Sequence, residues 1–413
     1  MPDFSRLLAV CNKVSSVSAV VLDKFLMYYA AAQEGLEREM DGRLARFREV
    51  TKGFKPAWVN LLKAQYIGHR IFKKDGLIHK YLHHTAVKAL EPEQLNYLKQ
   101  QSAHAWRYSF SEITAHPEGD FYEMEDVFSG ENFLLYSPSV TAILATESVT
   151  LWLNLIGFNG SCWQSYGPVL SFQGFQPDDI FFFATELNPR IETEEDLMKD
   201  MEANPFPYLM LINGSRYPMI LHGKDMLVQV LAEHPLETFD SSGLKKDFKV
   251  EYAKSIYRLT PKAWGEAPHF AAAYFDEDKK IMLLTSLTDQ GFRRLTDELN
   301  AHGFKLPADP DIHVQPAMLT AVKSILKKDL HLNPYEKLFE RKSTPGEQEM
   351  TKKLNRLLSL AIPLINAGKE PDIDALAKEA GVDMETARDV LAHTMSRIGK
   401  LRNQLDKKGK KKK

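Results

Sequence analysis

The feature that most constrains the fold of this chain is a change in hydrophobic period near Trp106. Up to about residue 103, apolar residues recur at spacings of three and four, as in LDKFLMYYAAAQEGLEREM and PAWVNLLKAQYIGHRIF. That spacing is typical of amphipathic helices. From Trp106 onward, WRYSFSEITAHPEGDFYEMED alternates apolar and polar residues, which is typical of strands with one buried face. The sequence therefore predicts an α+β protein whose N-terminal region, residues 1–103, is helical.

Two Asn-Gly pairs mark turns in the part of the chain that follows. LWLNLIGFNGSCWQSYG and YLMLINGSRYPMIL each place Asn-Gly between β-rich arms, which is the strongest short-range hairpin signal. A further strand pair is expected in HFAAAYFDEDKKIMLLTS, before a helix that ends at Gly303, and ETEEDLMKDMEA is expected to be a helical insert. We predict that residues 104–310 form a central β-rich α+β domain with antiparallel hairpins.

The last hundred residues return to helical periodicity. Residues 311–346 are expected to be connecting helices and a linker, ERKSTPGEQ, and residues 347–398 a tri-helical unit. Asp372 and Asp383 stand where helix N-caps are expected, and Gly381 tolerates the positive φ of a tight corner between the second and third helices. Residues 399–413 form a lysine-rich tail of low complexity.

The stretch LAKEAGVDMETARDVL carries a family resemblance. Over residues 372–398 the chain resembles the helix-turn-helix DNA-binding domains, with Ala377 where the helices cross, Gly381 at the corner, and apolar anchors at Val382, Ala387 and Val390. The resemblance implies that the second helix of the pair enters the major groove, with these residues nearest the bases: Asp383, Met384, Glu385, Arg388, Asp389 and Ala392. Three of them are acidic, a departure from the family pattern that repels phosphate. The alternative is a tri-helical corner used for packing or for binding a protein partner.

The charge of the chain is unevenly placed. The total is −2, but residues 399–413 hold eight Lys or Arg against one acid, so that the tail carries +7 and the rest of the chain −9. We expect any contact with a polyanion to be made by the tail, although lysine-rich ends also serve only as solubilising segments. The candidate nucleic-acid residues are Arg388, Arg397, Lys400, Arg402, Lys407, Lys408, Lys410, Lys411, Lys412 and Lys413.

A second, shorter resemblance covers residues 106–139. The strand, the acidic turn and the D-x-x-S/T-G-E turn at residues 126–131 resemble a small β-module of uncharacterised bacterial proteins. Some of those proteins carry a cysteine-rich metal-binding motif at a chain end, and this sequence has none. The resemblance therefore implies no activity and no metal.

Three groups of residues could carry chemistry, and each has a simpler interpretation. His79 and His83, with His69 upstream, are spaced for a metal on one helix face, but no acid lies in the group, so a solvated or partly buried face is favoured. The acids Glu112, Glu118, Asp120, Glu123, Glu125, Asp126 and Glu131 fit the wet face of a sheet better than an acid–base pair. Ser161, Cys162 and Ser165 lack a nucleophile-elbow pattern, and Cys162 beside Trp163 is expected to be core.

Other patterns limit the function classes. The chain lacks the P-loop, dinucleotide-binding and C-x-x-C motifs, so we expect no cofactor. Two cysteines, Cys11 and Cys162, are too few and too far apart to suggest a disulfide framework or a thiolate metal site. Asp23 and Lys24 interrupt the longest apolar run near the start, so we expect no signal peptide, no membrane span and a cytoplasmic location.

The leading hypothesis is a non-enzymatic binding or regulatory protein that contacts nucleic acid or another acidic partner through its tail and its helix-turn-helix-like unit. One alternative is a protein-interaction or scaffold module that uses exposed members of an aromatic set: Trp152, Trp163, Tyr166, Phe181, Phe182 and Phe183. The other alternative is an enzyme of unfamiliar type, which would need a pocket where several acids and a histidine converge.

Overall fold

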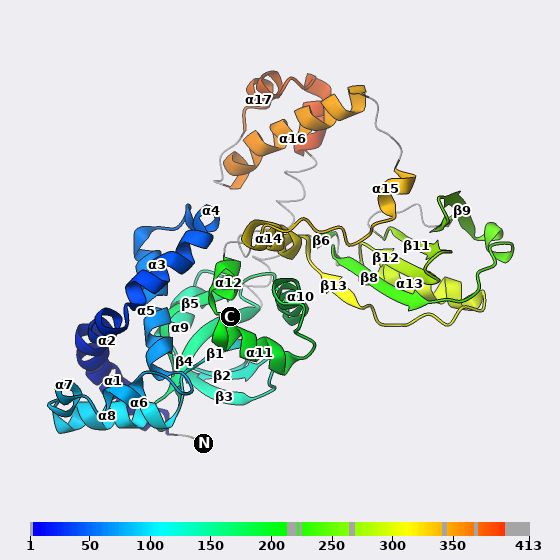
Figure 1. The fold of residues 1–413 in the computed structure, drawn as a ribbon. Helices are drawn as coiled ribbons and strands as arrows, with labels where there is room; N and C mark the ends of the chain where they lie inside the picture. Colours follow the sequence, from blue (N-terminus) through cyan, green and yellow to red (C-terminus); the bar gives the residue numbers. More distant parts are fainter. Residues whose placement is uncertain are drawn as a thin grey trace. The chain divides into compact units, whose positions relative to one another are not determined.

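The computed structural model describes residues 3–212, 221–222, 225–263, 269–340, 345–366 and 371–392. The chain divides into two compact units, Met1–Tyr335 and Glu336–Lys413, which are described separately. Helices and antiparallel strands are both present, as Figure 1 shows, and the predicted α+β class is confirmed.

The first hundred residues are helical, as the apolar spacing predicted. One long helix runs through α1 (Phe4–Val21), a π-helical turn (Leu22–Leu26) and α2 (Met27–Glu34). The helices that follow are α3 (Leu36–Arg46), α4 (Arg48–Thr51), α5 (Pro56–Phe72), α6 (Ile78–Tyr81), α7 (Thr85–Lys88) and α8 (Pro92–Ala103). Pro56 and Pro92 begin their helices because proline has no amide hydrogen and a backbone torsion already set for the first turn.

The next five strands close into a barrel. They are β1 (Arg107–Glu118), β2 (Phe121–Asp126), β3 (Asn132–Tyr136), β4 (Leu151–Phe158) and β5 (Trp163–Phe172). The order around the barrel is β1-β2-β3-β5-β4, with β1 also paired to β4 and with β3 parallel to β5. Helix α9 (Pro138–Leu144) joins β3 to β4 and packs Val140 into the barrel interior against Trp152. The strand order, with a helix between β3 and β4, resembles that of the OB barrel.

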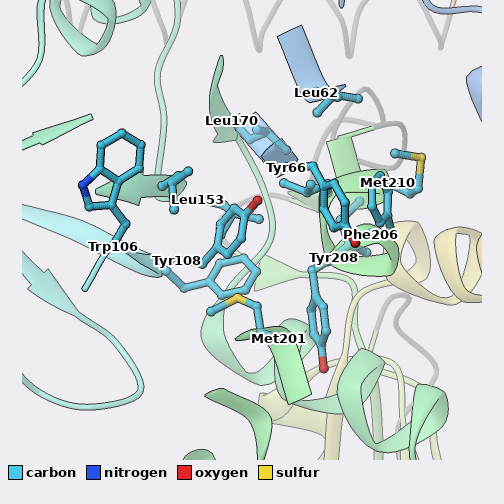
Figure 2. Close-up of a cluster of buried hydrophobic side chains, with 14 of the residues drawn as sticks. Leu62, Tyr66, Trp106, Tyr108, Leu153, Leu170, Met201, Phe206, Tyr208 and Met210 are labelled. Carbon is cyan, nitrogen blue, oxygen red and sulfur yellow. The ribbon is translucent and has the colours of Figure 1, made fainter. Parts of the chain in front are cut away.

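The outer face of β1, β4 and β5 is apolar and buried. Tyr108, Leu153 and Leu170 share one core with Leu62 and Tyr66 of α5 and with Phe206 and Tyr208, as Figure 2 shows. The helices on this core beyond the barrel are α10 (Pro177–Leu187), α11 (Glu194–Ala203), α12 (Phe206–Leu209) and α14 (Pro316–Leu326). The N-terminal helices and the barrel therefore fold around the same hydrophobic interior.

Two sequence-predicted hairpins have different outcomes. The first is confirmed, because β4 and β5 pair around residues 159–162 with Phe158 opposite Trp163. The first arm of the second prediction, YLML, is wrong: residues 206–209 are helix α12 and the chain continues helically to Ile212. Pro205 and Pro207 favour a helix start, and a run of side chains buried all round has no period that separates helix from strand. The turn at Asn213 lies outside the described residues.

A second sheet has its own core. Six antiparallel strands lie in the order β13-β8-β12-β11-β10-β9, and a separate pair is formed by β6 (Leu221–His222) and β7 (Asp225–Met226). The six are β8 (Gln229–Pro235), β9 (Phe248–Ala253), β10 (Ile256–Pro261), β11 (Ala271–Asp276), β12 (Ile281–Ser286) and β13 (Ile312–Val314). Helix α13 (Asp289–Ala301) packs Phe292, Leu295 and Leu299 into this core, followed by Gly303 at φ 94°. The described residues from β1 to β13 thus form the barrel, this six-stranded sheet and the short β6–β7 pair, and β13 lies in the stretch 311–346 that was expected to hold only helices and a linker.

The smaller unit is helical over its described residues. It contains α15 (Glu336–Phe339), α16 (Pro345–Asn366), α17 (Ile373–Ala380) and a helix over residues 384–392. The two expected caps are present: Asp372 Oδ1 accepts from the Ala375 amide at 3.1 Å, and Asp383 Oδ1 from the Thr386 amide at 2.9 Å. Gly381 has φ 70°, and a small core includes Leu357, Ala361, Leu376, Ala377, Ala387 and Leu391.

One helical stretch in the described part of the chain, Phe4–Glu34, is long and apolar enough to cross a membrane by length and composition. Its most apolar window has a mean hydropathy of 1.3. The core helix of a soluble protein and a signal sequence near the N-terminus can both reach this length and hydropathy. Val21, Leu22, Leu26 and Ala30 of this stretch are buried in the core shared with the barrel. The stretch is therefore weak evidence for a membrane span.

Candidate binding site

A cleft of about 730 Å³ lies between the N-terminal helices and the β4–β5 hairpin. Its walls come from the long helix α1–α2 with its π-helical turn, from α5 and α8, and from residues 157–167. Clefts of roughly 300–1,000 Å³ are typical of sites for small molecules. The cleft is thus large enough for a small organic ligand.

Trp106 forms an aromatic wall of the cleft and is held on several sides. Its ring stacks on Phe72 at a centroid distance of 4.5 Å and meets Tyr166 at 4.3 Å. Its Nε1 donates to Gln101 Oε1 at 2.7 Å, and Gln101 Nε2 donates to the Phe158 carbonyl at 3.0 Å. These contacts fix the indole, so the wall is formed before any ligand arrives.

Glycine 157 of β4 makes room for that indole. A Cβ atom at Gly157 would lie 2.5 Å from Trp106 Nε1 and 2.8 Å from two ring carbons, which is closer than a side chain tolerates. Only glycine lets the strand approach the indole this closely without displacing it. The sequence IGFNG marked a turn, but it gave no indication of this second role.

The π-helical turn carries the principal acid of the cleft. Asp23 lies in the turn, and its Oδ1 accepts a hydrogen bond from the Tyr166 hydroxyl at 2.8 Å. Single π-helical turns occur frequently at functional sites. Burial raises the pKa of Tyr166 well above its usual value, and the nearby Asp23 carboxylate raises it further. Burial also raises the pKa of Tyr97, with Asp23 again contributing, so both phenols stay neutral.

The charged side chains that line the cleft have a negative balance. Asp23 and Glu37 are acids, and Lys63 is the base. The Lys63 ammonium is paired with Asp41 at 2.5 Å, which compensates its charge. Tyr28 and Leu61 also line the cleft and are 68% and 47% exposed, so apolar surface extends to solvent there. The cleft thus combines acids with aromatic and apolar side chains.

Asn159 connects the cleft to a buried pair of thiols. The Sγ atoms of Cys11 in α1 and Cys162 in the β4–β5 loop are 3.5 Å apart. Asn159 Nδ2 lies 3.3 Å from the first sulfur and 3.4 Å from the second. Asn159 Oδ1 accepts from the amides of Ser161 and Cys162, each at 2.9 Å. Sequence reasoning missed this pair because 150 intervening residues hide a contact that only the fold creates.

The outer face of β2 and β3, where OB barrels commonly bind nucleic acids and sugars, is acidic or covered here. Glu123 and Glu125 are exposed on β2. Phe4 of α1 packs on Phe121 at a ring distance of 5.2 Å, and Tyr136 reaches Asn12. Exposed carboxylates repel phosphate, so this face is a poor nucleic-acid surface.

The sequence-predicted candidates for metal and acid–base chemistry do not converge. Helix α6 ends at Tyr81, so His79 and His83 do not share a helix face, and both are exposed. His69 is buried instead, with Nε2 2.6 Å from Glu202. Among the described residues, no three histidines, cysteines or acids gather as metal ligands would.

The acids of the first strands have structural partners or face solvent. Asp126 is buried and accepts hydrogen bonds from the Ser129 amide at 2.9 Å and from the Ser109 hydroxyl at 2.6 Å, so that it holds the β2–β3 turn. Glu112, Glu118, Glu123, Glu125 and Glu131 are exposed. The prediction of a wet acidic face is confirmed for these five and is wrong for Asp126, while Asp120 is partly buried and accepts a hydrogen bond from the Thr141 hydroxyl at 2.6 Å.

The expected nucleophile and aromatic groups are also placed. Ser165 lines the cleft, its hydroxyl 2.7 Å from that of Ser137, while Ser161 is exposed and Cys162 is buried as expected. None of the six aromatic residues of the predicted patch is exposed, and Trp152, Phe182 and Phe183 are fully buried or nearly so. These three build the core, whereas Trp163, Tyr166 and Phe181 are partly buried, and Tyr166 lines the cleft.

One nucleic-acid candidate lies among the described residues. Arg388 is exposed, and its guanidinium lies 3.5 Å from Asp374. Arg397 and the tail residues, Lys400, Arg402, Lys407, Lys408, Lys410, Lys411, Lys412 and Lys413, lie outside the described residues. Asp383, Glu385 and Asp389 are exposed on the described part of the third helix.

A second cavity, of about 760 Å³, lies among α10, α11 and β13. The cavity contains one histidine, His313, whose ring nitrogens lie 3.1 Å from Asp289 and 3.8 Å from Asp178. The imidazole therefore already has acidic partners. Aromatic and acidic side chains line this cavity too, among them Phe181, Phe182 and Asp178, but it has no counterpart of the fixed indole of Trp106. We therefore take the first cleft as the better candidate for a ligand.

No family model matches this chain, and no curated protein or solved structure matches it either. The candidate site therefore rests on its own geometry and chemistry.

Proposed function

We propose that this chain is a binding protein whose larger unit holds a small organic cation with an apolar body. The observation that carries the proposal is the cleft lined by Asp23, on a π-helical turn, by Tyr166, whose hydroxyl donates to Asp23, and by the immobilised Trp106, which packs on Tyr166. Aromatic faces and carboxylates both attract organic cations, and the attraction grows when water is excluded. The apolar side chains of the cleft then bury the body of the ligand.

The charge of the cleft favours a cation over an anion. Asp23 and Glu37 contribute two carboxylates, and Lys63 is occupied by Asp41. An anionic ligand would meet these carboxylates without an unpaired cation among the described lining residues. A neutral ligand would gain only the burial of its apolar surface and ordinary hydrogen bonds. An ammonium group gains a charge-assisted hydrogen bond as well.

A matched ligand series tests this proposal. Alkylammonium ions, alkylcarboxylates and alcohols of equal chain length are titrated by calorimetry into the full chain. We expect only the ammonium ions to bind well, and we expect Asp23→Asn to weaken that binding about tenfold or more, since a charge-assisted hydrogen bond contributes roughly 1.5–3 kcal/mol. Glu195→Gln removes an exposed acid of α11 outside the cleft and is the matched control. Equal binding of all three series, or of none, overturns the proposal.

A second candidate function concerns the smaller unit. We propose that it contacts nucleic acid or another polyanion, chiefly through the +7 tail, with the helix-turn-helix-like corner as its base. The capped helices around Gly381 support the corner, and the acids Asp383, Glu385 and Asp389 argue against reading bases with the third helix.

Salt dependence tests this second candidate. Binding of labelled duplex DNA is measured across salt for the full chain and for a chain ending at residue 398. Each tail charge that contacts phosphate adds about 0.9 to the slope of log affinity against log salt. The shortened chain should therefore bind more weakly and with a flatter slope. Equal affinity and slope in the two chains would remove the tail from the proposal, and no binding by either would remove the function.

A further inference from the structure

The only two cysteines of this chain are neighbours in space. Cys11 lies in the first helix and Cys162 follows β4, yet their Sγ atoms are 3.5 Å apart and both side chains are buried. A disulfide bond is about 2.05 Å long, so an approach of about 1.5 Å between the sulfurs would close one. Neither cysteine lines the cleft, so the inference about this pair does not rest on the proposed ligand.

The surroundings make the two sulfurs unequal. The Asn159 amide donates toward both sulfurs, and its position is fixed by two backbone amides that donate to its oxygen. A hydrogen bond from Cys11 lowers the pKa of Cys162, and the bond from Asn159 lowers it further against the effect of burial. The same hydrogen bond and burial raise the pKa of Cys11. We therefore assign the thiolate, which is the reactive form, to Cys162.

The thiol pair lies next to residues that line the cleft. Asn159 touches both sulfurs and also lines the cleft, beside Gln164 and Ser15. Gln164 Oε1 accepts from Asn159 at 3.0 Å, and its Nε2 reaches the Ser15 hydroxyl at 3.4 Å. The polar side chains that separate the thiols from the cleft are thus those that hold α1 against the barrel hairpin.

We infer that Cys11 and Cys162 form an oxidative modification site, at which hydrogen peroxide converts the two thiols into an intrachain disulfide that ties α1 to the β4–β5 loop. The Cys162 thiolate attacks one peroxide oxygen, the O–O bond breaks, and, after proton uptake, a sulfenic acid and one water result. The Cys11 sulfur then attacks the sulfenic sulfur, a second water leaves, and the disulfide remains. Two thiols and one peroxide thus give one disulfide and two waters.

The disulfide changes a wall of the cleft. Drawing the sulfurs together shifts Cys11 or Cys162, and with them the contacts of Asn159 and Gln164. Around the pair, Phe4, Phe121 and Tyr136 pack closely, so the movement is confined to this edge of the barrel. The oxidised chain gains a covalent bond across 150 intervening residues.

The test uses the full chain and a small excess of hydrogen peroxide. After quenching, free thiols are counted under denaturing conditions, and the protein is digested without reductant for mass spectrometry. We expect both thiols to disappear, the mass to fall by two hydrogen atoms, and a linked peptide to join the segments around Cys11 and Cys162. Dithiothreitol should restore both thiols.

Single variants make the result decisive. Cys11→Ser should leave Cys162 as a sulfenic acid that a dimedone probe captures, whereas Cys162→Ser should leave Cys11 unreacted under the same conditions. Asn159→Ala should slow closure several-fold relative to the unchanged chain. Retention of both thiols overturns the inference. So does loss of thiols through dimers between chains, or through sulfinic acids, without the linked peptide.

Discussion

A methyl group at Gly157 is a direct perturbation of the cleft wall. In Gly157→Ala the new Cβ would lie 2.5 Å from Trp106 Nε1 and 2.8 Å from the Cδ1 and Cε2 atoms of the same ring. The indole has little freedom to retreat, since it is 2% exposed and lies against Phe72 and Tyr166. Either the ring or strand β4 must therefore move.

The expected cost follows from two effects. Overpacking of a tight core typically destabilises a protein by about 1–3 kcal/mol. Movement of the ring also weakens the 2.7 Å hydrogen bond from Trp106 to Gln101. A hydrogen bond of this kind typically contributes about 1 kcal/mol to the free energy of unfolding. We therefore expect Gly157→Ala to lower the free energy of unfolding by about 2–4 kcal/mol.

Urea unfolding followed by tryptophan fluorescence measures this change. Four of the five tryptophans, Trp58, Trp106, Trp152 and Trp163, lie in the helices and barrel, so the signal reports on that part of the chain. Gly42→Ala is the control: its Cβ would meet no atom within 4 Å, and alanine in helix α3 should stabilise by about 0.5–1 kcal/mol. We take ~0.5 kcal/mol as the measurement error. A free energy of unfolding for Gly157→Ala that lies within this error of the parent value would refute the close approach of β4 to the indole.

Two further substitutions test other parts of the fold. Burial raises the pKa of Asp179 from 3.8 to about 6. Between about pH 4 and pH 6 the folded chain therefore keeps a proton on Asp179 that the unfolded chain has lost. The free energy of unfolding should fall by roughly 3 kcal/mol as the pH rises through this window. Asp179→Asn should remove that slope in urea unfolding at several pH values, and an unchanged slope would contradict the assignment. Gly381→Ala should destabilise the smaller unit by about 1–2 kcal/mol, because φ is 70° there while the new Cβ would meet only Lys353 at 3.7 Å. This loss of stability should appear as faster amide hydrogen exchange in α16 and α17 of Gly381→Ala. Gly346→Ala, which is unstrained, is the control, and exchange as slow as in the parent chain would contradict the prediction.

The elements that the sequence predicted correctly are those specified by local chemistry. Pro56 and Pro92 begin helices, Asn159-Gly160 turns a hairpin, and Asp372 and Asp383 cap helices, each through contacts with near neighbours in the chain. Such features depend on backbone torsions and short-range hydrogen bonds, so a single sequence reveals them.

The parts that escaped prediction depend on distant residues. Barrel closure needs the parallel pairing of β3 with β5 and the pairing of β1 with β4, which alternation in one strand does not specify. The π-helical turn at Asp23 has the same composition as an ordinary helix. Cys11 meets Cys162 and Asp23 meets Tyr166 only after the helices pack on the barrel. The candidate site is built from these long-range contacts, so the sequence did not disclose it.

Site mapping with a photoreactive alkylammonium ion tests the central claim most directly. A diazirine on the alkyl chain is activated in the presence of the full chain, and the labelled peptides are identified by mass spectrometry. The cleft predicts labels within residues 14–37, 60–67, 97–106 and 157–167, and it predicts their loss in Asp23→Asn. Labels confined to other segments, such as α10 and β13 at the second cavity, or labels unaffected by Asp23→Asn, would contradict it.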